Sequence, residues 1–237
     1  LIISSVGVYS RYSNDEQMLL RTSEAVGHHC ARSLPYDKPN PDCLIGEEKT
    51  EPKAKVLLWG DSHANHFFNT AKVASTSMPV TFELVSFAGC PSIRGVFRVN
   101  RAYSVKCYEH NEAVWEKLVK NGDFDAIVLA SNWANYPRGN NLGDNEDMSV
   151  STENSSRAFF SNMSNMISDM ALLEKPFFII DSVPNFPFNP ARCNINRKLL
   201  GQNRDCNLEE SEYKQGKAEF TTFIMQEVND KRNVHFV

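Results

Sequence analysis

Ser62 stands where a serine could act as a nucleophile. The apolar run 56–59 ends in Gly60-Asp61-Ser62, and the sequence that follows is compatible with a helix. The glycine permits a sharp turn, the aspartate can stabilise that turn, and N–H groups at a helix start favour developing negative charge. This arrangement suits acyl transfer through a serine ester. The same three residue types are also common in simple helix caps, so the surrounding chain must decide between the two interpretations.

Apolar runs alternate with segments of helical periodicity along the rest of the chain. The expected strands are 56–59, 80–87, 126–130, 177–181 and 234–237. The expected helices are 63–75, 108–121, 152–173 and 209–230. Strands that are apolar throughout and separated by helices indicate an α/β fold, with a mainly parallel sheet of about five strands covered on both faces.

Three residues with oxyanion-binding potential follow the ends of successive predicted strands. They are Ser62, Gly89 and Asn132. Parallel sheets place their functional sites at the carboxyl ends of the strands, so the topology brings these residues to one edge. A tetrahedral oxyanion needs several preorganised donors, and two backbone N–H groups with an asparagine amide would supply them.

This set of motifs resembles the SGNH (GDSL-like) hydrolase superfamily. It is most similar to the SGNH domains fused to the C-terminal side of membrane acyltransferase-3 proteins. The resemblance covers about residue 43 to the end and rests on Cys43-Leu44, the stretch 57–64, Gly89-Cys90-Pro91 and Trp133-Ala134. It implies a three-layer α/β/α sandwich, with Ser62 as the nucleophile and Ser62 N–H, Gly89 and Asn132 as the oxyanion donors.

The resemblance also implies a function. It implies a periplasmic O-acyltransferase that moves acyl groups, most often acetyl, onto hydroxyls of a surface polysaccharide such as lipopolysaccharide O-antigen. No bound cofactor is expected, because the acyl donor is a substrate delivered through an N-terminal acyltransferase-3 membrane domain. A carbohydrate or lipid esterase that uses water, and a noncatalytic glycan-binding module, are the alternatives.

The chain departs from the family pattern in two places. The usual Gly-x-Asn-Asp is replaced at 130–133 by Ala-Ser-Asn-Trp, so Asn135 could substitute for Asn132 as a donor. The usual Asp-x-x-His has no counterpart, because no aspartate stands three positions before any histidine. A serine without a base is a poor nucleophile at neutral pH, so we expect the base beyond Val237. The alternative is that this domain cannot turn over by the family's usual serine mechanism.

Several further side chains are expected beside the nucleophile. They are Asp61, His63, Trp133, Asn135 and Tyr136. Trp133 and Tyr136 are candidates to stack on a sugar, whereas Trp59 is expected in the core. The polar insertion 137–152 is a candidate contact for the acceptor sugar. The other histidines are expected to be solvated or to cap helices.

Asp61-Ser62-His63 also matches Asp-x-His, the first metal-binding element of calcineurin-like phosphoesterases, which would indicate a metal-dependent chemistry. That mechanism needs further ligands to bridge two metals. The required Gly-Asn-His-Asp does not occur, since residues 139–142 read Gly-Asn-Asn-Leu. We therefore expect no metal.

Length and charge limit the remaining possibilities. The chain has 237 residues, 41% of them hydrophobic, which is ordinary for one main α/β domain. Its net charge of −4 is spread along the sequence, so no basic field is present to hold nucleic acid. The apolar stretch 1–9 is too short to span a bilayer and is either a first strand or the end of a preceding membrane helix. We expect residues 1–52 to be a linker and lead-in after a membrane domain, and residues 53–237 to be the catalytic domain, truncated at its C-terminus.

The cysteines indicate an oxidising compartment. There are six and none forms a Cys-x-x-Cys pair: Cys30, Cys43, Cys90, Cys107, Cys193 and Cys206. Consecutive pairing would close three short loops, each worth about 3 kcal/mol, although six cysteines allow about fifteen connectivities. Free thiols in a cytosolic protein are the alternative. The segment 192–204 is expected to be a surface loop closed by the last pair.

Overall fold

The computed structural model describes residues 13, 30, 38–46, 52–99, 104–144, 147–183, 186–200, 203 and 205–237. Most of the expected lead-in 1–52 lies outside these residues, so its role as a linker stays a prediction. The described chain divides into two compact units, one formed by residues 28–183 with 216–237 and the other containing 184–215. The candidate site belongs to the first unit.

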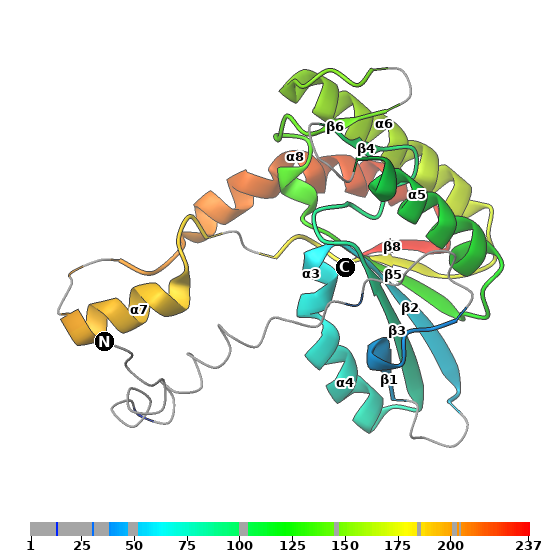
Figure 1. Cartoon of the computed structure of the whole chain (residues 1–237), viewed down its shortest axis with the longest axis horizontal. Helices are drawn as coiled ribbons and strands as arrows, with labels where there is room; N and C mark the ends of the chain where they lie inside the picture. Colours follow the sequence, from blue (N-terminus) through cyan, green and yellow to red (C-terminus); the bar gives the residue numbers. More distant parts are fainter. Residues whose placement is uncertain are drawn as a thin grey trace. The chain divides into compact units, whose positions relative to one another are not determined.

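A six-stranded sheet in the order β1-β3-β2-β5-β7-β8 forms the centre of the first unit (Figure 1). Its strands are β1 (Leu44–Ile45), β2 (Ala54–Gly60), β3 (Val80–Ser86), β5 (Ala126–Ala130), β7 (Phe177–Ile179) and β8 (Val234–Phe236). The five neighbouring strands β3, β2, β5, β7 and β8 are parallel, and β1 is antiparallel to β3. This confirms the predicted α/β class and its five parallel strands. The short edge strand β1 was not predicted.

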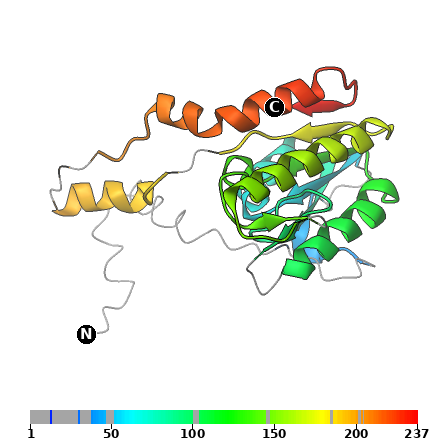
Figure 2. The ribbon, with the colours of Figure 1, turned by 90° about the horizontal axis from the view of Figure 1, so that it is seen from above.

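Helices cover both faces of this sheet. The longer helices described in the first unit are α3 (Ser62–His66), α4 (Phe68–Ser77), α5 (Ser104–Val114), its π-helical continuation Trp115–Lys120, α6 (Thr152–Ala171) and the part of α8 (Glu210–Val228) from residue 216. Two short 3₁₀ helices, Pro41–Cys43 and Trp133–Asn135, belong to the same unit. Figures 1 and 2 show α5 and α6 together over one face. The expected three-layer arrangement is therefore present.

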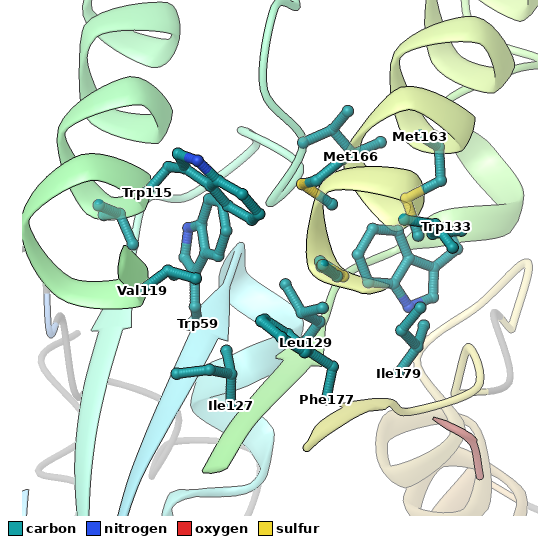
Figure 3. Packing of buried hydrophobic residues seen from close by; sticks show 14 of the residues in the cluster. Trp59, Trp115, Val119, Ile127, Leu129, Trp133, Met163, Met166, Phe177 and Ile179 are labelled. Atoms are coloured by element: carbon teal, nitrogen blue, oxygen red, sulfur yellow. The ribbon is translucent and has the colours of Figure 1, made fainter. Parts of the chain in front are cut away.

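Successive residues of β2 bury their side chains on opposite faces, as the two-residue period of a strand requires. Leu57 and Trp59 belong to the larger core with residues of α5, α6 and α8, whereas Leu58 packs with Ala64 and Phe68 of α3 and α4. Figure 3 shows Trp59 beside Trp115 in this larger core. The predicted core position of Trp59 is confirmed, since its side chain is fully buried.

All six cysteines form disulfides, and each disulfide joins two cysteines that are consecutive in the sequence. This is the consecutive pairing considered from the sequence. The pairs are Cys30–Cys43, Cys90–Cys107 and Cys193–Cys206. Each closes a loop of 13 to 17 positions, which restricts the unfolded chain.

The expectation of a loop at 192–204 is wrong over most of its length. Residues Pro190–Leu200 form helix α7 in the second unit. The Asn189 side chain accepts a hydrogen bond from the Arg192 N–H at 2.9 Å, and proline is favoured at the first helical position. Among the described residues, no helix has both the length and the apolar character needed to cross a bilayer.

Candidate active site

Three strands end in register at the edge of the sheet that carries the turn with Ser62. Gly60 of β2 pairs with Ser86 of β3 on one side and with Ala130 of β5 on the other. The segments that follow therefore leave the sheet side by side. The structure thus places the connections carrying Ser62, Gly89 and Asn132 at one edge, while their chemical roles stay predictions.

The turn between β2 and α3 has a strict steric requirement at Gly60. A Cβ at this position would overlap the backbone carbonyl oxygen of Ala130 and lie 2.8 Å from the Cβ of Ala64. The Asp61 side chain then caps the helix, because its Oδ1 accepts a hydrogen bond from the His63 N–H at 2.7 Å. The close approach of β5 at Gly60 and the Asp61 cap together position Ser62 as the first residue of α3.

Ser62 is exposed, and its hydroxyl makes no hydrogen bond with any residue that the structure describes. Its N–H has no intrahelical acceptor, because it lies in the first turn of the helix. A free hydroxyl beside a free backbone donor is the minimum that a serine nucleophile requires.

Gly89 adopts a left-handed backbone conformation with φ of 71°, which favours glycine. Within the described part of the chain, its N–H donates to no acceptor. The residue is half-buried at the turn that follows β3. These properties fit the predicted oxyanion donor.

The loop that carries Gly89 is fixed from several sides. Cys90 is linked to Cys107 of α5, and the fully buried Asn111 of the same helix donates to the carbonyl oxygens of Pro91 and Ile93, both at 2.7 Å. Such contacts rigidify the loop without help from a ligand. Asn111 was not singled out in the sequence, since nothing near it in the chain indicates its partners.

Asn132 begins the short 3₁₀ helix Trp133–Asn135, and its backbone N–H donates to Asp61 Oδ2 at 3.0 Å. Because that N–H is occupied, the predicted role of Asn132 as an oxyanion donor falls to its half-buried side-chain amide. Asn135, the predicted substitute, is exposed one turn further along. Both assignments stay predictions.

The Asp61 carboxylate links several segments of this edge. Its carboxylate is 1% exposed and accepts hydrogen bonds from the His63 N–H, the Asn132 N–H and the Tyr136 hydroxyl, the last at 2.6 Å. Three donors compensate the buried charge. In the described residues no group of three or more histidine, cysteine or acidic side chains is arranged to hold a metal.

The prediction that Trp133 and Tyr136 stack on a sugar is wrong. The Trp133 ring is fully buried, stacks on Phe220 with ring centres 5.7 Å apart, and donates from Nε1 to the Ile180 carbonyl at 2.8 Å. Figure 3 shows it within the core beside Met163. Tyr136 is 6% exposed and directs its hydroxyl to Asp61. The sequence placed both residues at the correct edge but contained no information on the direction of their side chains.

The histidines differ in environment. His63 is half-buried, with its ring centre 5.0 Å from that of His66. Burial lowers the pKa of His63; the nearby His66 lowers it further, whereas the Asp61 charge raises it.

His110, expected to be solvated or capping, is instead buried against Phe87, and burial lowers its pKa to about 4. His235 is exposed on β8, as expected for a solvated side chain. His28 and His29 lie outside the described residues.

The polar insertion 137–152 is partly ordered by secondary structure. Within it, β6 (Leu142–Gly143) pairs antiparallel with β4 (Phe97–Arg98), and the buried Asp144 forms an ion pair with Arg157 of α6. Its proposed contact with an acceptor sugar stays a prediction.

Comparisons with known proteins identify the family and the fold of the chain. A family model described as SGNH domain (fused to AT3 domains) matches residues 29–237, and the chain belongs to this family. The fold is similar to that of the periplasmic domain of a lipopolysaccharide acetyltransferase from Salmonella ser. Paratyphi A, with a TM-score of 0.57 and 13% sequence identity. That similarity covers 97% of this chain and 80% of the other. A search of the curated proteins finds no match.

Proposed function

We propose that this domain is a serine-dependent O-acyltransferase, in particular an O-acetyltransferase, that modifies hydroxyl groups of a cell-surface polysaccharide such as lipopolysaccharide O-antigen. The observation that carries the proposal is the exposed Ser62 hydroxyl at the first residue of α3. The backbone N–H groups of Ser62 and Gly89 donate to no acceptor among the residues that the structure describes. Membership of a family fused to AT3 domains supports acyl transfer.

The proposed reaction has two acyl-transfer steps. In the first, Ser62 Oγ attacks the carbonyl carbon of the acyl donor and loses its proton to a base, and the tetrahedral oxyanion receives hydrogen bonds from Ser62 N–H, Gly89 N–H and the Asn132 amide. The bond to the leaving group then breaks, and the leaving group takes the proton. In the second step a sugar hydroxyl attacks the carbonyl carbon of the Ser62 ester and gives its proton to the base. The bond between the acyl carbon and Ser62 Oγ then breaks, and Ser62 Oγ takes up that proton to restore the free serine.

The base of this route is proposed to be the family's Asp-x-x-His. Strand β8 is parallel to β7, so the two strands end at the same edge of the sheet. Two hydrogen bonds keep the chain ends together there: the Val237 N–H donates to the Ile179 carbonyl, and the Asp181 N–H donates to the Val237 carbonyl. Any chain that continues from Val237 therefore emerges at the edge that holds Ser62. An aspartate and a histidine in such a continuation would be in position to serve Ser62.

The proposed setting is the periplasmic face of the bacterial inner membrane, with an acyltransferase-3 membrane domain on the N-terminal side. The three disulfides support an oxidising compartment. In this scheme the membrane domain delivers the acyl group, and the SGNH domain needs no bound cofactor.

Water is the alternative acceptor, which an exposed Ser62 would also admit. The two outcomes separate when the protein is incubated with O-antigen polysaccharide and p-nitrophenyl acetate and the products are analysed by NMR. A transferase gives O-acetylated sugar, an esterase gives acetate without it, and a glycan-binding module gives neither above background. Ser62→Ala should abolish the reaction and Ser77→Ala, at another exposed serine, should not. Transfer retained by Ser62→Ala would refute the proposed nucleophile.

A further inference from the structure

We propose that Tyr136 is a positioning residue of this site: its hydroxyl holds the Asp61 carboxylate and thereby fixes the Asn132 segment against the nucleophile turn. The inference rests on the proposed function, since the residue matters for catalysis only if Ser62 and the oxyanion donors react. Tyr136 itself is 6% exposed and so acts through Asp61 and not on a substrate.

The Asp61 carboxylate joins two strand connections. Its Oδ1 accepts from the His63 N–H and so belongs to the cap of α3. Its Oδ2 accepts both the Asn132 N–H at 3.0 Å and the Tyr136 hydroxyl at 2.6 Å, which come from the connection after β5. The Asp61 carboxylate, next to Ser62, therefore binds the segment 132–136 at both of its ends.

The hydrogen bond from Tyr136 is of the strong type. It joins a hydroxyl to a carboxylate that is 1% exposed, and its 2.6 Å length is typical of a charge-assisted bond. Loss of this donor would leave a buried anionic oxygen with one partner fewer, a situation that proteins avoid. The segment would then shift, or water would enter, to restore the missing donor.

The phenol ring of Tyr136 is itself held in place. It stacks on Phe159 of α6 with ring centres 6.5 Å apart, and the Arg98 guanidinium lies 5.4 Å from its centre. Arg98 is 5% exposed and donates to Asn141 Oδ1 at 2.9 Å. The attraction between this positive charge and the π electrons of the ring helps to hold the ring in place. The hydroxyl thus reaches Asp61 from a fixed position.

Oxyanion stabilisation depends on donors placed within a few tenths of an ångström, because the hydrogen bonds must match the developing charge. A displaced Asn132 amide would weaken this match without changing the exposed surface on which a substrate first binds. The expected signature of losing the Tyr136 hydroxyl is therefore a lower kcat with an unchanged KM.

The first test compares wild type with Tyr136→Phe, which keeps the ring and removes only the hydroxyl. With p-nitrophenyl acetate as substrate, kcat should fall by about 10- to 100-fold and KM should stay within about twofold. The matched control is Ser164→Ala, which also removes a hydroxyl bonded to a carboxylate, here Glu227, but lies between α6 and α8. Its kcat should equal that of wild type.

The second test does not depend on activity. Hydrogen exchange of the amides of residues 131–136 should be about tenfold faster in Tyr136→Phe than in wild type and unchanged in Ser164→Ala. If wild type shows no Ser62-dependent ester cleavage, the proposed function fails, and exchange alone decides whether Tyr136 holds the segment. Unchanged exchange, or a wild-type kcat in an active Tyr136→Phe protein, overturns the inference.

Should Tyr136→Phe fail to fold, Asp61→Asn tests the carboxylate through which Tyr136 acts. The asparagine oxygen can still accept a hydrogen bond from the His63 N–H. The amide nitrogen, however, would face the Asn132 N–H, and because both groups are donors that hydrogen bond would be lost. A lowered kcat with an unchanged KM supports the inference, and wild-type turnover contradicts it.

Discussion

The hydroxyl groups of Ser92 and Ser131 lie 3.1 Å apart, and both residues are at most 2% exposed. The Ser92 N–H also donates to Ser131 Oγ at 3.2 Å. Ser92 follows Gly89 by three positions, and Ser131 directly precedes Asn132. This pair therefore couples the two connections that carry the candidate oxyanion donors.

Removing the Ser131 hydroxyl should lower the stability of the domain. Ser131→Ala leaves the buried N–H and hydroxyl of Ser92 without this partner, which costs about 1–3 kcal/mol. Urea denaturation followed by circular dichroism measures the effect. Ser77→Ala at an exposed site should change the free energy of unfolding by no more than about 0.5 kcal/mol, and an equal effect of the two changes would contradict the coupling.

The disulfide beside Gly89 should matter more for turnover than the one in the second unit. Replacing either Cys90 and Cys107 or Cys193 and Cys206 by alanine opens a loop of similar size, 17 or 13 positions, at a stability cost of about 3 kcal/mol. Only the first replacement loosens the Gly89 loop. We expect it alone to lower kcat for p-nitrophenyl acetate, by about tenfold or more; equal kcat values in the two double variants would argue against this loop as part of the site.

Substituting Gly89 should impair both stability and catalysis. Alanine at a φ of 71° costs about 1–2 kcal/mol, and relief of that strain turns the N–H away from its present direction. A fall in kcat of about 10- to 100-fold is expected in the same ester assay. Gly216→Ala is the matched control: a Cβ there meets nothing within 4 Å in α8, so helix stability should rise slightly at unchanged kcat. Wild-type kcat in Gly89→Ala would exclude this N–H as a donor.

Acid should destabilise the domain through His110. Burial lowers its pKa from 6.5 to about 4, so between these values the unfolded chain binds more protons than the folded protein. The stability contribution is complete above pH 6.5 and is lost as the pH falls, by roughly 3 kcal/mol at pH 4.

Urea unfolding of wild type and His110→Gln at several pH values between 4 and 7 checks this prediction. The variant should show a shallower loss of stability toward acid pH, because glutamine does not titrate. Parallel pH profiles of the two proteins would show that another group is responsible.

The sequence was sufficient for the central sheet because the runs 56–59, 126–130 and 177–179 are continuously apolar and are separated by segments of helical spacing. It missed β1, since Leu44–Ile45 is too short to show a period. It missed α7 because the proline and cysteines of 190–206 are typical of loops as well as of helix starts.

The candidate site was only partly predictable for a physical reason. Gly60 to Ser62 form a local motif, and strand order brings Gly89 and Asn132 to the same edge. The contacts that fix them join residues far apart, such as Ser92 with Ser131 and Asp61 with Tyr136, 39 and 75 positions away. No local pattern contains such pairs, because they depend on side-chain directions at strand ends.

The most direct test of Ser62 as the nucleophile is to detect the covalent acyl intermediate on its side chain. The protein is mixed with p-nitrophenyl acetate, quenched in acid within the first turnover, digested and analysed by mass spectrometry. We predict one acetyl group on the peptide that contains Ser62, present in Ser77→Ala and missing in Ser62→Ala. An acetyl group on a different residue, or polysaccharide acetylation that persists in Ser62→Ala, would contradict the proposed nucleophile.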